Sequence, residues 1–332
     1  MRKPFGLREA YRAVPDFISN AQILPELTQL VLSTAGEQED PNFDYADDVF
    51  GVVPTGHYNI RIPTRFGEYL VKRDTLREAR SDMGFVDRQY SFTDRTMKRN
   101  TLAGLVDDDE MKNADPWTVS ADAAADARDI VRISLALDKA AIILNTANYN
   151  THFAILAGQG FNLSNGLHLK DVVDQGVHSI KQATGVPRNR LKLVLLGQLA
   201  EDAAIRDFEL MNRSMYTSAP VYATLDRIKD YLGIAEVKSY APIYRTNAVT
   251  GTPTEMFPTG AMWLGYPGQQ ATLPRGGIVW GRIFRMGGSG GALPPFRVDE
   301  KTSMAYPWQV REDVEVFNTG AAVLITSPWQ DS

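Results

Sequence analysis

The chain has 332 residues, of which 44% are hydrophobic and 23% are charged, so it is long enough to bury a core and to form two or three sub-domains. It contains no cysteine, which excludes disulfide bonds, thiolate metal sites and cysteine nucleophiles. The formal net charge of −5 argues against tight binding to nucleic-acid phosphates, because that affinity depends on lysine and arginine displacing counterions. Without an apolar secretory signal or a run of about 18 apolar residues, we expect a protein that stays in the cytosol and contacts no membrane.

Residues 1–53 are predicted to form an arm rather than a self-contained domain. Pro15, Pro25 and Pro41 interrupt short apolar clusters, and an acidic segment follows the second of these prolines. The apolar residues of such an arm need another surface to cover.

Residues 57–92 are predicted to form a long β-hairpin. Tyr58, Ile60 and Ile62 alternate with polar residues, and a weaker alternation returns between Val86 and Phe92. The tip between the two strands is dense in charge: Lys72, Arg73, Asp74, Arg77, Glu78, Arg80 and Asp82. A two-stranded ribbon is marginal alone in water, so we expect this one to rest on a partner. The alternative is a solvated flap over an active site.

The stretch 93–119 is predicted to be rich in turns. It contains four consecutive acids, Asp107 to Glu110, which could suggest a calcium site. An EF-hand needs alternating carboxylates, a central glycine and a glutamate at position twelve, and none of these is present. We interpret the run as a solvated acidic loop.

Residues 120–148 are predicted to form one long helix, with Ser120 as its N-cap and Asp122 in its first turn. Small and aliphatic residues recur at steps of three and four and predict a single buried stripe: Ala123, Ala127, Ile130, Ile133, Leu137, Ala141 and Leu144. A helix of this length runs roughly 40 Å and needs support from outside its own domain. An ordinary core helix of an α/β enzyme is the alternative interpretation.

The rest of the chain predicts a small α/β lobe followed by strands. A helix at 169–184 ends at Gly185, a buried strand covers 191–197, and a helix that begins near Gln198 contains Ala203, Ile205 and Phe208. A helix at 224–232 and a strand at 234–240 complete a lobe that we place at about 190–275. Strands at 278–286 and 321–325 flank a glycine-rich loop.

No motif in the sequence predicts catalysis, a cofactor or a metal. Residues 287–291 fit the G-x-S-x-G pattern of a nucleophile elbow, but prolines follow instead of a helix, and the last histidine, His178, precedes the serine. The four histidines include no pair spaced by four residues. We therefore predict no catalytic, cofactor-binding or metal-binding residues.

Three stretches resemble the major capsid protein of tailed bacteriophages, the Hong Kong 97 type. YSFTDRTMKRNTLAGLVDDDEMKNAD leading into IVRISLALDKAAIIL looks like the return from that family's extended loop into its spine helix. RLKLVLLGQLAEDAAIRDF looks like the strand and helix that open its axial domain. LDRIKDYLGIAEVKSYAPIYRTN followed by AMWLGYPG looks like a helix that feeds a strand and an open loop, then an outgoing strand.

The resemblance covers about residues 55–330 and implies an α+β fold with five parts. These are an N-terminal arm at 1–53, an extended β-hairpin loop at 54–95, a peripheral domain with the spine helix at 96–189, an α/β axial domain at 190–275, and closing strands at 276–332. The resemblance also implies that the hairpin of one subunit lies over its neighbour. Charged residues at the hairpin tip are then the candidate inter-subunit contacts: Arg65, Lys72, Arg73, Asp74, Arg77, Glu78 and Arg80.

The function that this resemblance implies is structural. Many copies would assemble as hexamers and pentamers into an icosahedral shell around a double-stranded DNA genome, with weak contacts to the DNA. The expected partners are a separate scaffolding protein, a portal and in some cases a decoration protein, and the expected location is the virion, assembled in the host cytoplasm. Some family members join subunits through a lysine–asparagine bond, but no partner for Lys72 is identified here and we predict no such cross-link. An encapsulin-type nanocompartment shell and a cytosolic α/β enzyme are the alternatives.

Overall fold

The structure is a computed structural model that describes residues 28, 29, 31, 41–64, 91–113, 116–164, 166–215, 224–245, 251–267, 278–286 and 290–329. The chain divides into two compact units. Unit 1 comprises 1–39, 99–132 and 288–311, and unit 2 comprises 40–98, 133–287 and 312–332. The units are described separately below.

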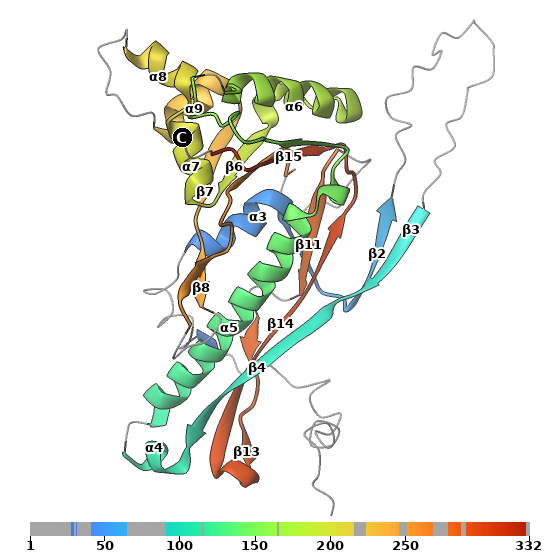
Figure 1. Cartoon of the computed structure of the whole chain (residues 1–332). Helices are drawn as coiled ribbons and strands as arrows, with labels where there is room; N and C mark the ends of the chain where they lie inside the picture. Colours follow the sequence, from blue (N-terminus) through green and yellow to red (C-terminus); the bar gives the residue numbers. More distant parts are fainter. Residues whose placement is uncertain are drawn as a thin grey trace, which may run out of the picture. The chain divides into compact units, whose positions relative to one another are not determined.

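Unit 2 contains a five-stranded mixed sheet in the order β5-β15-β10-β6-β7 (Figure 1). The strands are β5 (Thr151–Ala154), β15 (Ala322–Thr326), β10 (Ala261–Gly265), β6 (Lys192–Leu196) and β7 (Glu236–Tyr240). The central strand β10 runs antiparallel to both neighbours, whereas β5 and β7 pair in parallel with β15 and β6. Because the central strands are covered on both faces, they are continuously apolar rather than alternating.

One face of this sheet is covered by helices of the small α/β lobe. These are α6 (Leu169–Thr184), α7 (Gln198–Ile205), α8 (Phe208–Met215) and α9 (Leu225–Leu232). Leu193, Leu195 and Leu264 point into a core shared with α6, α7 and α9. The predicted helix at 169–184 is confirmed, and it ends where Gly185 adopts the left-handed conformation that glycine accepts without strain.

The opposite face is packed with aromatic residues. Val194, Trp263 and Leu324, which alternate with the residues named above, share a second core with the short helix α3 (Tyr45–Phe50) and with the last turns of α5. The ring of Trp280 stacks between Phe50 and Tyr149, with centroid distances of 4.8 and 5.0 Å. The described end of the arm is therefore part of the core of unit 2.

A second set of strands in unit 2 lies beside α3. Strand β1 (Val52–Thr55) pairs in parallel with β11 (Gly281–Met286), and β11 pairs antiparallel with residues 312–316 of the long strand β14 (Ser303–Val316). A short hairpin joins β8 (Ile243–Arg245) and β9 (Pro253–Glu255). The predicted strand at 278–286 is confirmed from Gly281 onward.

Unit 1 is built on β4 (Lys98–Asp107), which pairs with β14, and on the short strands β12 (Gly291–Ala292) and β13 (Phe296–Val298), which also pair with β14. The first half of α5 (Pro116–Leu144) packs on β4. A Cβ atom on Gly104 would lie 2.1 Å from the carbonyl oxygen of Ala123, so only glycine permits this approach of helix and strand. The helix α4 (Asp108–Asn113) follows β4 directly.

The prediction for the long helix is right in type and wrong in two details. Helix α5 has 29 residues, about 43 Å at 1.5 Å per residue. It begins at Pro116, so Ser120 is a buried helical residue and not an N-cap, and Asp122 lies beyond the first turn. The buried stripe also differs from the predicted one after Ala127: Ile130 is 56% exposed, and the buried apolar positions are shifted by one or two residues, to Val131, Leu135, Ala136, Ala140 and Ile143. The helix is apolar over a wide arc, so spacing alone did not fix which side faces inward.

The prediction that 93–119 is rich in turns is wrong. Strands β3 (Ser91–Thr96) and β4 occupy most of it, and three of the four acids open α4 rather than lying in a loop. Both faces of β4 carry polar residues, so the alternation that marks a half-buried strand is missing. Phe208 likewise begins a separate helix, α8, instead of continuing α7.

Candidate assembly ribbon and its anchoring charges

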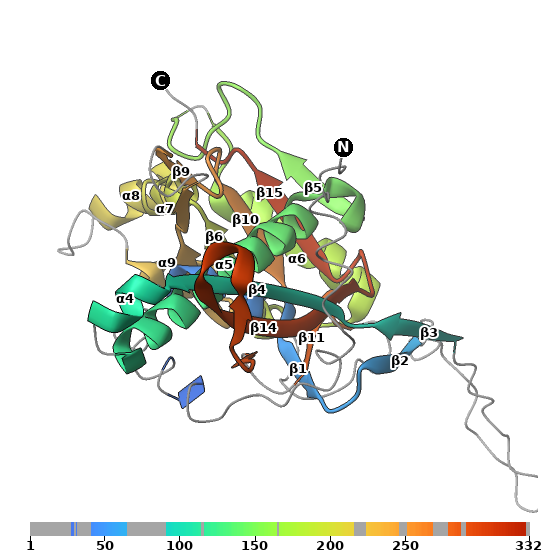
Figure 2. The same cartoon turned by 90° about the horizontal axis from the view of Figure 1, so that it is seen from below.

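The described base of the predicted hairpin is a two-stranded ribbon. Strands β2 (Asn59–Thr64) and β3 pair antiparallel, from Asn59 opposite Thr96 to Thr64 opposite Ser91. Within the described part of the chain, no third strand pairs with either of them. Figures 1 and 2 show the ribbon projecting outward beyond β1 and β11 in two perpendicular views. The predicted hairpin is thus confirmed over these residues.

The ribbon is attached to unit 2 by a small apolar cluster at its base. Ile62 and Met97 are almost fully buried and contact Val53 of β1 and Phe284 of β11. The backbone N–H of Met97 also donates to the carbonyl oxygen of Tyr58 at 3.1 Å. The side chains on either side of this cluster are exposed.

One ion pair adds to this attachment. Arg95 of β3 lies 2.5 Å from Glu315 of β14, and the hydrogen bond and charge of Glu315 raise the pKa of the arginine. A cross-strand pair between Arg61 and Asp94 is 69% and 80% exposed, so it contributes little within one subunit. This pair on the ribbon is therefore open to solvent.

The candidate contact residues at the hairpin tip all lie outside the described residues. These are Arg65, Lys72, Arg73, Asp74, Arg77, Glu78 and Arg80. They remain a prediction.

A chain of buried ion pairs lies next to the ribbon base in unit 2, and it was missed by the sequence reasoning. Lys139 of α5 lies 2.6 Å from Glu312 of β14, and the Nε of Arg285 of β11 donates to the same carboxylate at 3.0 Å. Arg285 also contacts Asp47 of α3 at 3.1 Å. Burial works against the charge of Arg285, but Asp47 and Glu312 outweigh it and raise its pKa.

These ion pairs join four elements that are distant in sequence. Glu312 is 3% exposed and Lys139 is 6% exposed, so water screens the contact weakly. The sequence of β14 at this point is typical of an exposed acidic strand. The fold shows instead that Glu312 and Glu315 form ion pairs with basic residues of α5, β11 and β3.

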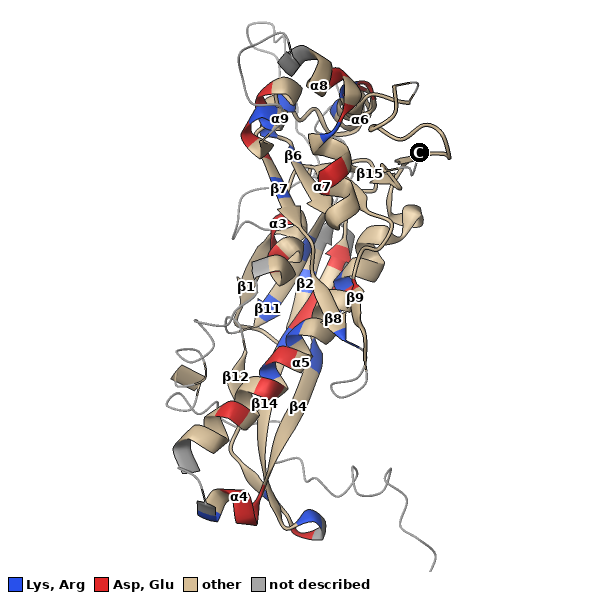
Figure 3. Cartoon of the chain, turned by 60° about the vertical axis from the view of Figure 1, so that its left-hand side comes forward, with Lys and Arg blue, Asp and Glu red and all other residues tan. Residues whose placement is uncertain are grey.

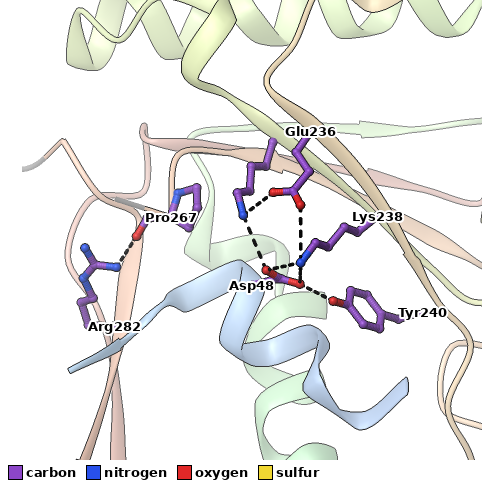
Figure 4. A network of polar contacts seen from close by, with 7 residues as sticks. Asp48, Glu236, Lys238, Tyr240, Pro267 and Arg282 are labelled. Carbon is purple, nitrogen blue, oxygen red and sulfur yellow. Dashed lines mark hydrogen bonds and ion pairs between the residues drawn. The ribbon is translucent and has the colours of Figure 1, made fainter. Parts of the chain in front are cut away.

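A second network binds α3 to the edge of the five-stranded sheet. The ammonium of Lys238 lies 2.9 and 3.0 Å from the two carboxylate oxygens of Asp48, and Lys192 lies 3.6 Å away (Figure 4). The hydroxyl of Tyr240 donates to the same carboxylate, and Glu236 contacts both lysines.

The acids elsewhere are not arranged as a metal site. Asp107 accepts from the hydroxyl of Ser303, and Asp108 pairs with Arg297 at 2.7 Å, all in unit 1. Within the described ranges, no group of three or more His, Asp or Glu side chains could hold a metal ion. The Asp47 and Asp48 carboxylates face cations, which is the arrangement of structural ion pairs. Acidic side chains also recur along α5 (Figure 3).

Of the helices that the structure describes, none combines the length and the apolar character needed to cross a membrane. Ser289 of the G-x-S-x-G pattern lies outside the described residues.

Comparison with known proteins gives similarity in structure but not in sequence. No protein-family model matches the chain, and no curated protein matches it in a sequence search. A phage-related protein from Bordetella bronchiseptica RB50 is similar at a TM-score of 0.68 and 18% identity, over 93% of this chain and 98% of that one.

Two solved capsids are also similar. The capsid structure of cyanophage P-SCSP1u has a TM-score of 0.52 and 8% identity, over 83% of this chain and 86% of that one. The capsid of a native GTA particle has a TM-score of 0.51 and 11% identity, over 86% and 90%. The chain has the α+β, Hong Kong 97-like fold of phage capsid structures, and the predicted fold class is confirmed.

Proposed function

We propose that this chain is the major capsid protein of a tailed double-stranded DNA phage, a structural subunit that assembles into an icosahedral shell around the genome. The observation that supports this most directly is the ribbon. Asn59 and Arg61 of β2 and Asp94 to Thr96 of β3 are exposed in the isolated chain, while Ile62 and Met97 attach the ribbon to β1 and β11. Because a two-stranded ribbon is marginal in water, a neighbouring copy is the surface that would complete its burial.

The fold supports the same proposal by analogy. The two capsids compared above are shells, and this chain covers 86% and 90% of their subunits. A shared fold does not by itself assign a function, so the ribbon carries the argument and the fold is secondary. The shell would consist of hexamers and pentamers of this chain.

The contacts that we propose between copies lie at the hairpin tip. Positive and negative residues alternate closely in sequence there, in the order Arg65, Lys72, Arg73, Asp74, Arg77, Glu78 and Arg80. Mixed charge of this kind favours matching across an interface and disfavours wrong registers, because like charges that face each other are costly.

We also propose the functional division of the chain given by the family resemblance. The arm would span 1–53, the extended loop 54–95, the peripheral domain 96–189, the axial domain 190–275 and the closing strands 276–332. A scaffolding protein, a portal and a decoration protein are the proposed partners. The packaged DNA would be contacted weakly, in keeping with the net charge of −5. Assembly would take place in the host cytoplasm.

The test is assembly of the purified protein. We expect light scattering and negative-stain electron microscopy to show closed particles, alone or with co-expressed scaffolding protein. A stable species smaller than a hexamer under all assembly conditions would contradict the proposal and favour a cytosolic α/β enzyme. Particles that contain a cargo enzyme instead of DNA would favour an encapsulin-type shell.

A deletion variant tests the part played by the hairpin. Removal of Gly67 to Gly84 should leave the thermal unfolding of the subunit unchanged, because the apolar cluster of the ribbon base stays intact. It should abolish closed particles. Normal particles from this variant would show that the hairpin is not an assembly contact.

A further inference from the structure

The short helix α3 carries two adjacent aspartates that contact different sheets of unit 2. Asp47 contacts Arg285 of β11 at 3.1 Å, and Asp48 contacts Lys238 of β7 at 2.9 Å. Consecutive helical residues point about 100° apart, so one short helix can reach two surfaces at once. We call these two aspartates and the cations that they contact the α3 clamp.

On the Asp48 side of the clamp, three side chains surround the Asp48 carboxylate (Figure 4). Lys238 approaches both carboxylate oxygens, Lys192 approaches one, and the Tyr240 hydroxyl donates to the other. Burial opposes the charge of Asp48, but the hydrogen bonds from Lys238 and Tyr240 outweigh it, so the pKa of Asp48 is lowered. The carboxylate is therefore charged at neutral pH.

The Asp47 side continues the buried chain of ion pairs. Arg285 is shared between Asp47 and Glu312, and Glu312 also contacts Lys139 of α5. An alternating chain of charges thus extends from α5 through β14 and β11 to α3. From the neighbouring Asp48 it continues to β7.

Helix α3 is held by these ion pairs together with its fully buried side chains Tyr45, Val49 and Phe50. It has six residues, which is too short for a stable helix in water, so its contacts with its surroundings must hold it. Its other anchors include the Tyr45 hydroxyl, which donates to the carbonyl oxygen of Ala136, and Arg282, which donates to the carbonyl oxygen of Phe50 at 3.0 Å.

The ribbon begins a few residues after α3. Gly51 has a φ of +70°, which turns the chain directly from α3 into β1. Strand β1 supplies Val53 to the cluster that holds Ile62 and Met97 at the ribbon base. A change in the position of α3 therefore acts directly on β1, which also pairs with β11, and on the Val53 wall of the ribbon attachment.

We infer that the α3 clamp is an ionic switch that couples the two sheets of unit 2 to the ribbon, so that its release frees the ribbon base while the rest of the unit stays folded. The free-standing subunit then exists in a clamped form and in a released form with a mobile ribbon. The coupling is a property of the single subunit. Its consequence for shell assembly rests on the proposed function.

Among the described residues, the titratable groups that face the clamp come from six elements besides α3. These groups are Asp44 from η2 (Pro41–Asp44), Lys192 from β6, Glu236, Lys238 and Tyr240 from β7, Arg285 from β11, and Glu312 from β14 with its partner Lys139. Both sides of the clamp are partly exposed, since Asp47 and Lys238 are each 38% exposed. Salt should therefore weaken both sides before it weakens the buried pair of Lys139 and Glu312.

The test is hydrogen–deuterium exchange of the full-length, unassembled subunit at neutral pH, which does not require a shell. Asp48→Asn should raise the exchange of the amides in 45–55 and in 59–64 together, by about tenfold, and should leave α6 and β10 unchanged. Asp230→Asn is the matched control, because it removes the same charge from an exposed residue of α9, outside the clamp, and should change neither segment.

Two outcomes would overturn the inference. In the first, Asp48→Asn speeds exchange in 45–50 while 59–64 keeps its wild-type rate, so the clamp is not coupled to the ribbon. In the second, neither segment responds. If Asp48→Asn does not fold, exchange of the wild-type chain is measured between about 0.05 and 1 M NaCl, a range over which the Debye length shortens several-fold. The inference then requires that the amides of 45–55 and 59–64 exchange faster together as the salt concentration rises.

A failure of the shell proposal is distinguishable from a failure of this one. If the protein never assembles but shows coupled exchange, the shell proposal fails and the α3 clamp stands. If it assembles but shows no coupled exchange, the shell proposal stands and the α3 clamp fails.

Discussion

The buried ion pair between Lys139 and Glu312 provides a quantitative test of how unit 2 is held together. Glu312 is paired with two cations, at 2.6 Å from Lys139 and 3.0 Å from Arg285, with 3% of its surface exposed. Glu312→Ala leaves Lys139 as a buried ammonium without a carboxylate at that contact. Removal of one partner of such a pair costs about 3–5 kcal/mol, because the remaining charge has already lost its water.

Lys139→Met should cost less than Glu312→Ala. Glu312 keeps Arg285 in that variant, so the loss is roughly one charged hydrogen bond, about 1.5–3 kcal/mol, offset in part by the apolar methionine. For a unit of this size 1 kcal/mol corresponds to roughly 2–4 °C, so Glu312→Ala should lower the melting temperature of unit 2 by about 6–20 °C.

The assay is thermal unfolding of the unassembled subunit, followed by tryptophan fluorescence because Trp280 and Trp263 are buried in unit 2. The double variant Lys139→Met, Glu312→Leu should recover most of the loss, because a buried pair replaced by apolar groups is often neutral. The reasoning is refuted if Lys139→Met costs more than Glu312→Ala, or if the double variant is as unstable as the sum of the two.

Three further predictions concern single residues of unit 2. Gly197→Ala should destabilise the unit by at least about 1–3 kcal/mol in chemical unfolding, since Gly197 has a φ of +90° and an added Cβ would lie 2.4 Å from the carbonyl oxygen of Phe257. Because the pKa of Asp48 is lowered from 3.8, its charge stabilises the fold above that pH, and the difference in melting temperature between wild type and Asp48→Asn should shrink as the pH falls below 3.8. Arg95→Met should lower the free energy of unfolding by only roughly 0–1 kcal/mol, because Arg95 is 45% exposed, while amide exchange in β3 increases.

Elements with one strong pattern could be predicted from the sequence. In α6, Val172, Val173, Val177 and Ile180 mark a narrow apolar side, and Gly185 gives a clear end. The strand at 192–196 was recognisable because it is apolar at nearly every position and bounded by glycine. In both cases local propensity and tertiary burial agree, which is the condition for a reliable prediction.

Helix α5 shows where a pattern is present but ambiguous. Ile130 and Val131 are both apolar, and either could lie on the buried side at a spacing of three or four. The structure buries Val131 and leaves Ile130 exposed. Lys139 also lies on the buried side, and no sequence rule places a lysine there unless its partner, Glu312, is already known.

The charges that hold α3 could not have been predicted, because the partners are far apart in sequence. Asp48 meets Lys238 at a separation of 190 residues, and Asp47 meets Arg285 at 238. In the sequence both acids belong to an acidic run, which is typical of a solvated segment. The only local sign was that Tyr45, Val49 and Phe50 give the same run an apolar side.

Charged residues therefore have two roles in unit 2, and the role depends on whether the ion pair is buried or exposed. Lys139 and Glu312 are screened weakly and hold elements together inside the subunit. Arg61 and Asp94 on the ribbon are at least 69% exposed and contribute little until another surface covers them. The shell subunit that we propose needs both properties, because it must be folded before it meets its neighbours and must still bind them reversibly while errors are corrected. Charges buried at the base of the ribbon and exposed along it satisfy both requirements in one structure.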